Sequence, residues 1–217
     1  VGLVLKKAGL RGQLPVAHLT ALPKLRTLDL AQNFLSGGVP SALVFETPEL
    51  EYLDLSDNTL TGDIPELSDG REAPAALRSL RLHRNGLSGP VPEWFADIET
   101  LQVVMLHNNA LTGQVPELLP TMPLLHTLYL HNNNLSGALP FGALCNGDRL
   151  QNLYLSNNGL DGVIPDCGAA GAPPALEHLA LDGNTFAGAI PASLAASPLM
   201  RILELQQNDL TGSVPQF

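Results

Sequence analysis

The sequence predicts an α/β-type repeat solenoid, in which stacked coils contribute parallel strands to one concave sheet. Three observations predict it. The frame L-x-x-L-x-L-x-x-N-x-L-x-G-x-I/V/L-P fits nine times within 217 residues, and its asparagines stand 24 to 27 residues apart. The glycine and the closing proline are present in all nine copies. A fixed period of about 20 to 50 residues indicates a repeat array, so we expect a single array over residues 1–217.

Each fixed letter of the frame has a physical role. The L-x-L segment alternates as a short strand does, with leucines inward and variable residues outward. The asparagine can bond backbone groups of its own coil and of the next one, which the turn would otherwise leave unpaired. The glycine allows positive φ or a close backbone approach, and the proline ends strand pairing and turns the chain to the opposite side. The eight asparagines are Asn33, Asn58, Asn85, Asn109, Asn133, Asn158, Asn184 and Asn208.

Composition excludes several classes of function. The formal net charge is −10 and there is no basic tract, which argues against nucleic acid as a partner. No apolar run reaches the roughly 18 residues of a membrane span, so we expect no transmembrane segment. The sequence has no nucleophile elbow, phosphate loop or metalloprotease helix, and an open sheet excludes little water. We therefore expect neither an enzyme nor a bound cofactor.

The full frame resembles the plant-specific class of leucine-rich repeats (LRRs) over residues 3–215. Proteins of this class include receptor-kinase ectodomains and polygalacturonase-inhibiting proteins. The resemblance implies a right-handed superhelix, a second short strand near L-x-G, and 3₁₀ turns on the convex side.

Such proteins usually carry paired-cysteine caps at both ends, and this chain has neither. We expect a fragment of a longer array, the alternative being that partner surfaces close its ends. Without such a covering, the apolar residues of the end coils would face water. They are Leu3, Leu5, Leu10, Leu203, Leu205 and Leu210, with Val214.

Two cysteines and one sequon favour the secretory pathway. Cys145 and Cys167 lie in successive repeats, after the closing proline and outside the leucine frame. A bridge between them would close about 23 residues and contribute roughly 3 kcal/mol, the alternative being two reduced thiols. The sequon at Asn134 predicts a glycosylation site. Both features favour an extracellular or cell-surface location.

The outward positions of three consecutive repeats, over residues 101–158, carry no formal charge. Tyrosine, methionine and amide side chains of this kind are typical of interface centres. We predict a binding surface, the central patch, whose residues are Met105, His107, Tyr129, His131 and Tyr154. The alternative is that the two tyrosines only stabilise adjoining strands.

Opposite charges line up on the two preceding strands, where Glu51, Asp54 and Asp57 should stand beside Arg78, Arg81 and Arg84. The simpler interpretation is a self-neutralising ladder on adjacent strands. The alternative comes from the family resemblance, because some peptide-sensing receptor kinases grip a terminal carboxylate with two arginines. The segment "RLHR" at 81–84 is only partly similar, with Arg81 in place and His83 where the second arginine would stand. Arg81 and His83 are therefore further candidate ligand contacts.

His83, His107 and His131 fall in one column on consecutive strands. Three imidazoles about 5 Å apart could share a metal or respond to pH. A solvated surface ladder is the simpler interpretation because no carboxylate converges on them, and we expect no metal site.

These observations together predict a recognition module that binds a protein or peptide on its concave face, as a receptor ectodomain or a secreted inhibitor does. A carbohydrate-facing cell-wall protein is one alternative, because tyrosines and amides also suit sugars. A structural segment of a larger multiprotein assembly is another. Glycan binding would favour the first alternative, and comigration with a stable complex the second.

Overall fold

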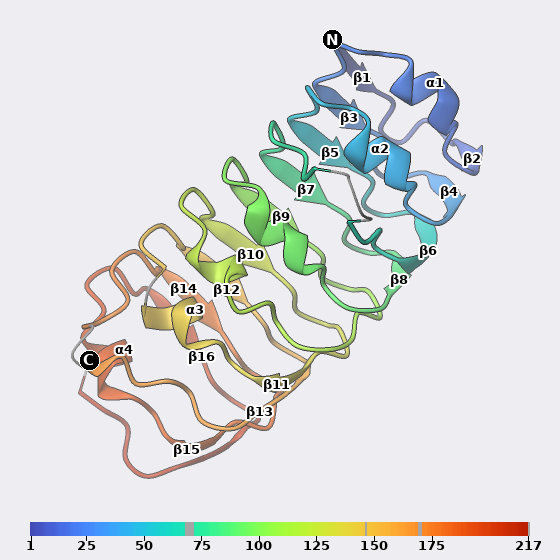
Figure 1. Ribbon diagram of the computed structural model, residues 1–217. Helices are drawn as coiled ribbons and strands as arrows, with labels where there is room; N and C mark the ends of the chain where they lie inside the picture. Colours follow the sequence, from blue (N-terminus) through green and yellow to red (C-terminus); the bar gives the residue numbers. More distant parts are fainter. Residues whose placement is uncertain (68–71, 146, 169–170, 217) are drawn as a thin grey trace.

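The protein is a stack of coils that follow one another from the N-terminal to the C-terminal end (Figure 1). This computed structural model describes residues 1–67, 72–145, 147–168 and 171–216. Within these residues, each coil adds one strand to a nine-stranded parallel sheet. In sheet order the strands are β1 (Gly2–Val4), β3 (Thr27–Asp29), β5 (Tyr52–Asp54), β7 (Ser79–Arg81), β9 (Val103–Met105), β10 (Thr127–Tyr129), β12 (Asn152–Tyr154), β14 (His178–Ala180) and β16 (Ile202–Glu204).

Neighbouring strands of this sheet are in register, so the frame leucines face one another. Leu53 stands opposite Leu28 on one side and Leu80 on the other. Leu128 and Leu153 are paired in the same way, and both are fully buried. Because side chains alternate along a strand, the residues flanking each leucine face outward. The predicted solenoid and its parallel sheet are confirmed.

A second set of short strands follows the asparagine turns, as the family resemblance implies. In the described residues, four of them form the sheet β2-β4-β6-β8, and the others pair as β11-β13 and β15-β17. The frame glycine of every coil has positive φ, between 71° and 88°, which explains why no other residue occupies that position. The strands are β2 (Arg11–Gly12), β4 (Phe34–Gly37), β6 (Thr59–Asp63), β8 (Gly86–Ser88), β11 (Ser136–Ala138), β13 (Gly159–Asp161), β15 (Ala187–Ala189) and β17 (Asp209–Thr211).

Five of the six described helices on the convex side begin directly after a closing proline. Pro15, Pro40, Pro92 and Pro191 are the N-caps of α1, α2, η1 and α4. A proline suits this position because its φ is fixed and the first amides of a helix have no partner within it. The described helices are α1 (Val16–Thr20), α2 (Ser41–Phe45), η1 (Glu93–Asp97), η2 (Leu119–Thr121), α3 (Phe141–Cys145) and α4 (Ala192–Ala195).

The expectation of 3₁₀ turns on the convex side is only partly right. Among the described helices, η1 and η2 are 3₁₀ and the other four are α-helical. Length alone does not decide the type, because η1 and α2 both have five residues. In the second of them, the Glu46 N–H donates to the Ala42 carbonyl at 2.8 Å.

A column of asparagines joins each coil to the coil before it. The Asn133 side chain is 7% exposed, and its Oδ1 accepts a hydrogen bond from the Leu111 N–H at 3.0 Å. Its Nδ2 donates to the Leu106 and Leu130 carbonyls at 3.2 and 2.9 Å. The asparagine therefore bonds backbone groups of two coils, as predicted, but the second coil is the preceding one and not the next. The pattern recurs at Asn33, Asn58, Asn85, Asn109, Asn158, Asn184 and Asn208.

Both end coils leave an apolar hollow, of about 360 Å³ at the first coil and about 340 Å³ at the last. Leu5 and Val214 are exposed, as predicted, with exposed fractions of 40% and 71%. The other predicted end residues pack partly against the core, so they face water less than the sequence indicated. These are Leu3, Leu10, Leu203, Leu205 and Leu210.

Candidate functional site

The two tyrosines of the central patch are neighbours on the outward face of the sheet. Met105, Tyr129 and Tyr154 stand directly opposite one another on β9, β10 and β12. The Tyr129 and Tyr154 rings meet edge to face, with centroids 4.5 Å apart. Both rings are half-buried, and burial raises the pKa of each phenol, so both stay protonated at neutral pH.

The three histidines form a continuous stack beside the tyrosines. The His107 ring centroid lies 4.4 Å from that of His83 and 4.3 Å from that of His131, with interplanar angles of 13°. Their Nδ1 atoms are buried and form no hydrogen bond within the described part of the chain. A buried N–H without an acceptor is costly, so we infer that each ring carries its proton on Nε2. The stack is therefore packed at its base, and the expected surface ladder is only partly solvated.

Burial keeps the stacked imidazoles neutral. Burial, together with the facing charges of His131, His83 and Arg84, lowers the pKa of His107 to about 3. The pKa values of His83 and His131 are also lowered, mainly by burial. Within the described residues, no group of three or more His, Cys, Asp or Glu side chains is arranged to hold a metal.

The stack should make stability depend on pH. Each histidine pKa is lower in the folded state than the 6.5 of an exposed imidazole, so the unfolded chain takes up protons first as pH falls. The contribution of the stack to stability is fully present above pH 6.5. It is lost as the pH falls towards 3, the folded-state pKa of His107. After discounting for solvent screening of these half-exposed rings, we expect His107 to contribute a loss of about 1 kcal/mol by about pH 4.

Urea unfolding of the wild type and of His107→Ser, at neutral pH and at about pH 4, measures this loss. Serine is a matched replacement because Ser56 and Ser156 occupy the same column in other coils. The variant should lose less stability on acidification than the wild type. Equal losses would show that the stack does not titrate with folding.

A hollow of about 360 Å³ opens where the tyrosines meet the histidine stack. Its described lining extends beyond the central patch to Ser156, Asp182 and Glu204. The Ser156 hydroxyl donates a hydrogen bond to Asp182, and the negative charge of Glu204 helps to raise the pKa of Tyr154. The hollow thus has aromatic walls and an acidic edge. Its lining residues are His107, Tyr129, His131, Tyr154, Ser156, Asp182 and Glu204.

Sequence reasoning missed this acidic edge because it selected three repeats for their lack of charge. A signal was available, since Glu204 continues the column of Tyr154 and Asp182 that of His131. The sequence analysis did not select His178, whose Nδ1 lies 3.1 Å from the Tyr154 hydroxyl and orients that ring.

The ladder of opposite charges is confirmed at two of its three rungs. Arg78 pairs with Glu51, and Arg84 with Asp57, each at 3.5 Å. At the third rung, Asp54 and Arg81 are opposite in register but bind other groups. The Asp54 carboxylate accepts hydrogen bonds from the Tyr52 and Ser56 hydroxyls at 3.0 and 2.6 Å.

Arg81 and His83, the further candidate contacts, lie at the N-terminal side of the central patch. Arg81 is opposite Met105, and its guanidinium carbon is 5.2 Å from the Tyr52 ring centroid. His83 is the first ring of the histidine stack. Neither residue lines the hollow described above.

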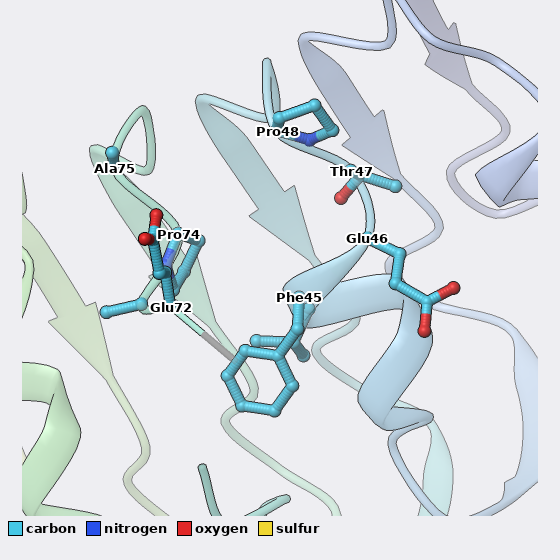
Figure 2. A pocket seen from close by; sticks show the side chains of 9 residues that line it. Phe45, Glu46, Thr47, Pro48, Glu72, Pro74 and Ala75 are labelled. Atoms are coloured by element: carbon cyan, nitrogen blue, oxygen red, sulfur yellow. The ribbon is translucent and has the colours of Figure 1, made fainter. Parts of the chain in front are cut away.

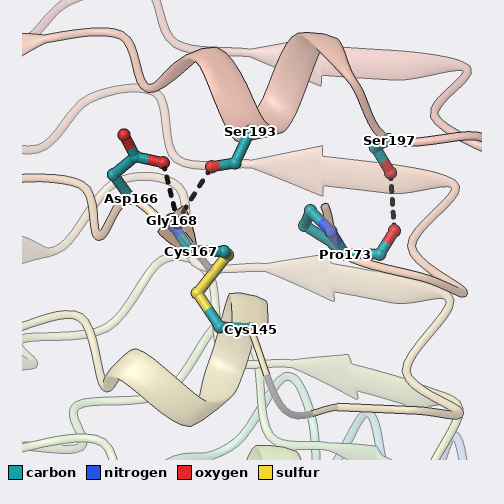
Figure 3. Close-up of a disulfide and its surroundings, with 7 residues drawn as sticks. All are labelled: Cys145, Asp166, Cys167, Gly168, Pro173, Ser193 and Ser197. Carbon is teal, nitrogen blue, oxygen red and sulfur yellow. Dashed lines mark hydrogen bonds between the residues drawn. A yellow bond between two sulfur atoms is a disulfide. The ribbon is translucent and has the colours of Figure 1, made fainter. Parts of the chain in front are cut away.

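A disulfide joins Cys145 to Cys167, as predicted, with a sequence separation of 22 (Figure 3). The expectation that both cysteines lie outside the leucine frame is correct, yet both are buried within the core, with exposed fractions of 7% and 3%. The predicted glycosylation residue, Asn134, is exposed just before β11, so its side chain is accessible.

A second hollow, of about 420 Å³, lies on the helix side between α2 and the segment 72–75 (Figure 2). Its lining includes Glu46, Glu72 and the prolines Pro48 and Pro74. Phe45 also lines it and packs against Trp94, with ring centroids 5.1 Å apart. It is larger than the concave hollow, but its lining residues lie on α2 and loops and not on aligned strands of the sheet. We therefore place the candidate site on the concave face.

The repeat frame, the parallel register and the asparagine column point to one family. Sequence profiles described as leucine-rich repeats match residues 24–45, 49–69, 75–135 and 149–169. The chain belongs to the leucine-rich repeat family. Comparison with curated proteins gave no match to this leucine-rich repeat chain. None of the helices in its described part has the length and apolar character needed to span a bilayer.

Three solved structures similar to this leucine-rich repeat chain are plant proteins. One is the plant peptide hormone receptor RGFR1 in complex with RGF2, at 29% identity and a TM-score of 0.87, covering 94% of this chain and 32% of that chain. Another is the ectodomain of the Arabidopsis thaliana membrane receptor kinase GASSHO1/SCHENGEN3 in complex with CASPARIAN STRIP INTEGRITY FACTOR 2. There the identity is 31% and the TM-score 0.74, covering 97% of this chain and 27% of that chain.

A third similar structure is a plant ice-binding protein, at 28% identity and a TM-score of 0.82, covering 99% of this chain and 66% of that chain. This chain therefore spans less than a third of each of the two receptor chains and about two thirds of the ice-binding protein. The plant-type repeat that the sequence frame indicated is confirmed.

Proposed function

We propose that this leucine-rich repeat array binds an extended peptide or protein segment along its concave face, centred on the central patch. The observation that carries the proposal is the hollow of about 360 Å³ between Tyr129, Tyr154 and the histidine stack. Half-buried aromatic rings offer contact area at a low entropic cost, and neutral imidazoles and amides bond without a large desolvation penalty.

Two further observations support a peptide ligand. One of the similar receptors is a plant peptide hormone receptor in complex with RGF2, and the other is in complex with CASPARIAN STRIP INTEGRITY FACTOR 2. Beside the histidine stack, Asn108, Asn132 and Asn157 form a ladder of amides linked at 3.0 and 2.9 Å. Amide ladders can bond the backbone of an extended chain that crosses several coils.

We place the array in a receptor ectodomain or a secreted inhibitor, outside the cell. The Cys145–Cys167 bond supports an oxidising compartment. The exposed side chain of Asn134 permits glycosylation there, which mass spectrometry of the secreted protein would test.

Selection from a displayed peptide library, with the 217-residue chain as bait, tests the binding proposal. We expect Tyr129→Ala and Tyr154→Ala each to lower the affinity for the selected peptides about tenfold, because truncating a central aromatic contact costs more than about 1 kcal/mol of binding free energy. Phe34→Ala is the matched control, since Phe34 is an exposed aromatic residue on β4, away from the concave sheet. Peptides that bind the double tyrosine variant as tightly as the wild type would refute the proposed site.

A further inference from the structure

We propose that the concave hollow holds a basic side chain, a guanidinium or ammonium group, projecting from the bound peptide. This inference rests on the proposed function and names the chemistry that the site selects. Three features of the hollow carry it: aromatic walls, carboxylates at one edge, and imidazoles that bear no charge at neutral pH.

The walls suit a cation. The Tyr129 and Tyr154 rings meet edge to face, and the His131 ring centroid lies 6.0 Å from each of them. Cations bind over the negative face of a tyrosine ring within about 6 Å of its centroid. Because His107 and His131 are neutral, neither repels a positive group that enters the hollow.

The acidic edge supplies the opposite charge. Asp182 and Glu204 line the hollow, and neither forms an ion pair within the described part of the chain. Arg201, a cation at this end of the sheet, pairs instead with Glu177 at 3.1 Å. One neutral donor, the Ser156 hydroxyl, bonds to Asp182. The negative charge of the edge is therefore left for a ligand to balance.

The same chemistry already occurs elsewhere on the concave face. Arg81 lies over the Tyr52 ring, with its guanidinium carbon 5.2 Å from the centroid. The Tyr52 hydroxyl donates to Asp54, whose carboxylate stands opposite Arg81 in register. There the chain supplies tyrosine, carboxylate and guanidinium together. At the hollow it supplies the tyrosines and carboxylates, and the cation has to come from outside.

An anionic group fits this hollow poorly. It would approach Asp182 and Glu204, while Arg78 and Arg84, on the N-terminal side of the patch, are already paired with acidic residues. The formal net charge of −10 also favours the approach of a basic segment over an acidic one.

The direct test uses Nα-acetyl-arginine methylamide as the probe and its uncharged analogue, Nα-acetyl-citrulline methylamide, as the control ligand. The chain has 3 tyrosines, so ring-labelled tyrosine gives one NMR signal set for each. We expect the arginine probe to shift the signals of Tyr129 and Tyr154 in the millimolar range and to leave Tyr52, already covered by Arg81, unchanged. The citrulline probe should bind more weakly.

An Asp182→Asn/Glu204→Gln double variant should bind the arginine probe about fivefold more weakly, the usual effect of losing two partly exposed charge contacts. Its affinity for the citrulline probe should be unchanged. Glu177→Gln is the matched control, because Glu177 is paired with Arg201 and lies outside the hollow. Equal binding of the two probes, no shift at Tyr129 and Tyr154, or an unchanged double variant would each overturn the inference.

The inference and the proposed function can fail separately. If library peptides bind and require Tyr129 and Tyr154, but the double acidic variant binds them as the wild type does, the function stands and the basic side chain is wrong. If no library peptide binds while the arginine probe still shifts both tyrosines, the hollow accepts a cation and the proposed function fails.

Discussion

An Asn133→Ala variant should lose about 3 kcal/mol of its free energy of unfolding, because the truncation leaves a buried backbone amide without a partner. The Leu111 N–H donates to the Asn133 Oδ1 at 3.0 Å, deep between two coils. The Leu106 and Leu130 carbonyls also lose a donor, but each keeps a bond to another asparagine, Asn109 or Asn158. Most of the loss therefore comes from the Leu111 amide.

Urea unfolding monitored by circular dichroism measures this loss, and Asn134→Ala is the matched control. Asn134 is the next residue, and its side chain is exposed. Its replacement should change stability by less than about 0.5 kcal/mol, as is usual for surface substitutions. Equal effects of the two variants would mean that the asparagine column does not hold the coils together.

Most of the fold could be predicted because each frame letter specifies one local conformation. The leucines predict the register that places Leu53 between Leu28 and Leu80. A second requirement stayed hidden. The residue just before each frame asparagine also has positive φ, as at Asp57 and Arg84. The types that occupy this position vary, because the coil geometry imposes the conformation on them, so no fixed letter marks it.

The candidate site could be predicted only in part, because its outline depends on how neighbouring coils close around it. The tyrosine pair and the histidine column follow from counting along the frame. Asp182 and Glu204 lie in later repeats. They were not predicted because the site was sought only in uncharged repeats. Their place in the hollow depends on side-chain directions at Tyr154 and Ser156, which the repeat frame leaves open.

Burial was the other property that the frame could not give. The three histidines occupy outward positions, yet stacking at 4.4 and 4.3 Å buries their Nδ1 atoms. Identical rings at identical positions can adopt one rotamer and pack face to face. A single histidine in the column would be more exposed to water.

Replacing both cysteines of the Cys145–Cys167 bond by alanine should lower the free energy of unfolding by about 3 kcal/mol. The bond links α3 to the following coil across a sequence separation of 22. A cross-link of this length removes loop entropy from the unfolded chain worth roughly 3 kcal/mol. Alanine is preferred to serine because both positions are buried in the apolar core, where a hydroxyl would need a partner.

Loss of the disulfide should destabilise the convex side before the sheet unfolds. Two hydrogen bonds near the disulfide join segments on the convex side: the Ser193 hydroxyl accepts from the Cys167 N–H at 3.2 Å, and the Ser197 hydroxyl donates to the Pro173 carbonyl at 2.8 Å (Figure 3). The sheet strands β12 and β14 on either side keep their leucines fully buried. Hydrogen exchange in the double alanine variant should therefore rise first around α3 and Cys167, and only later in β12.

Ser193→Ala is the matched control, because it removes a contact beside the bond and leaves the cross-link in place. It should cost about 1 kcal/mol, the usual value of one hydrogen bond. Oxidised and reduced wild-type protein that unfold at the same urea concentration would contradict the prediction, since reduction removes the cross-link without changing any residue. A uniform rise in exchange across β12 and α3 would contradict its location, because it would mean that the bond holds the whole stack and not the convex edge of two coils.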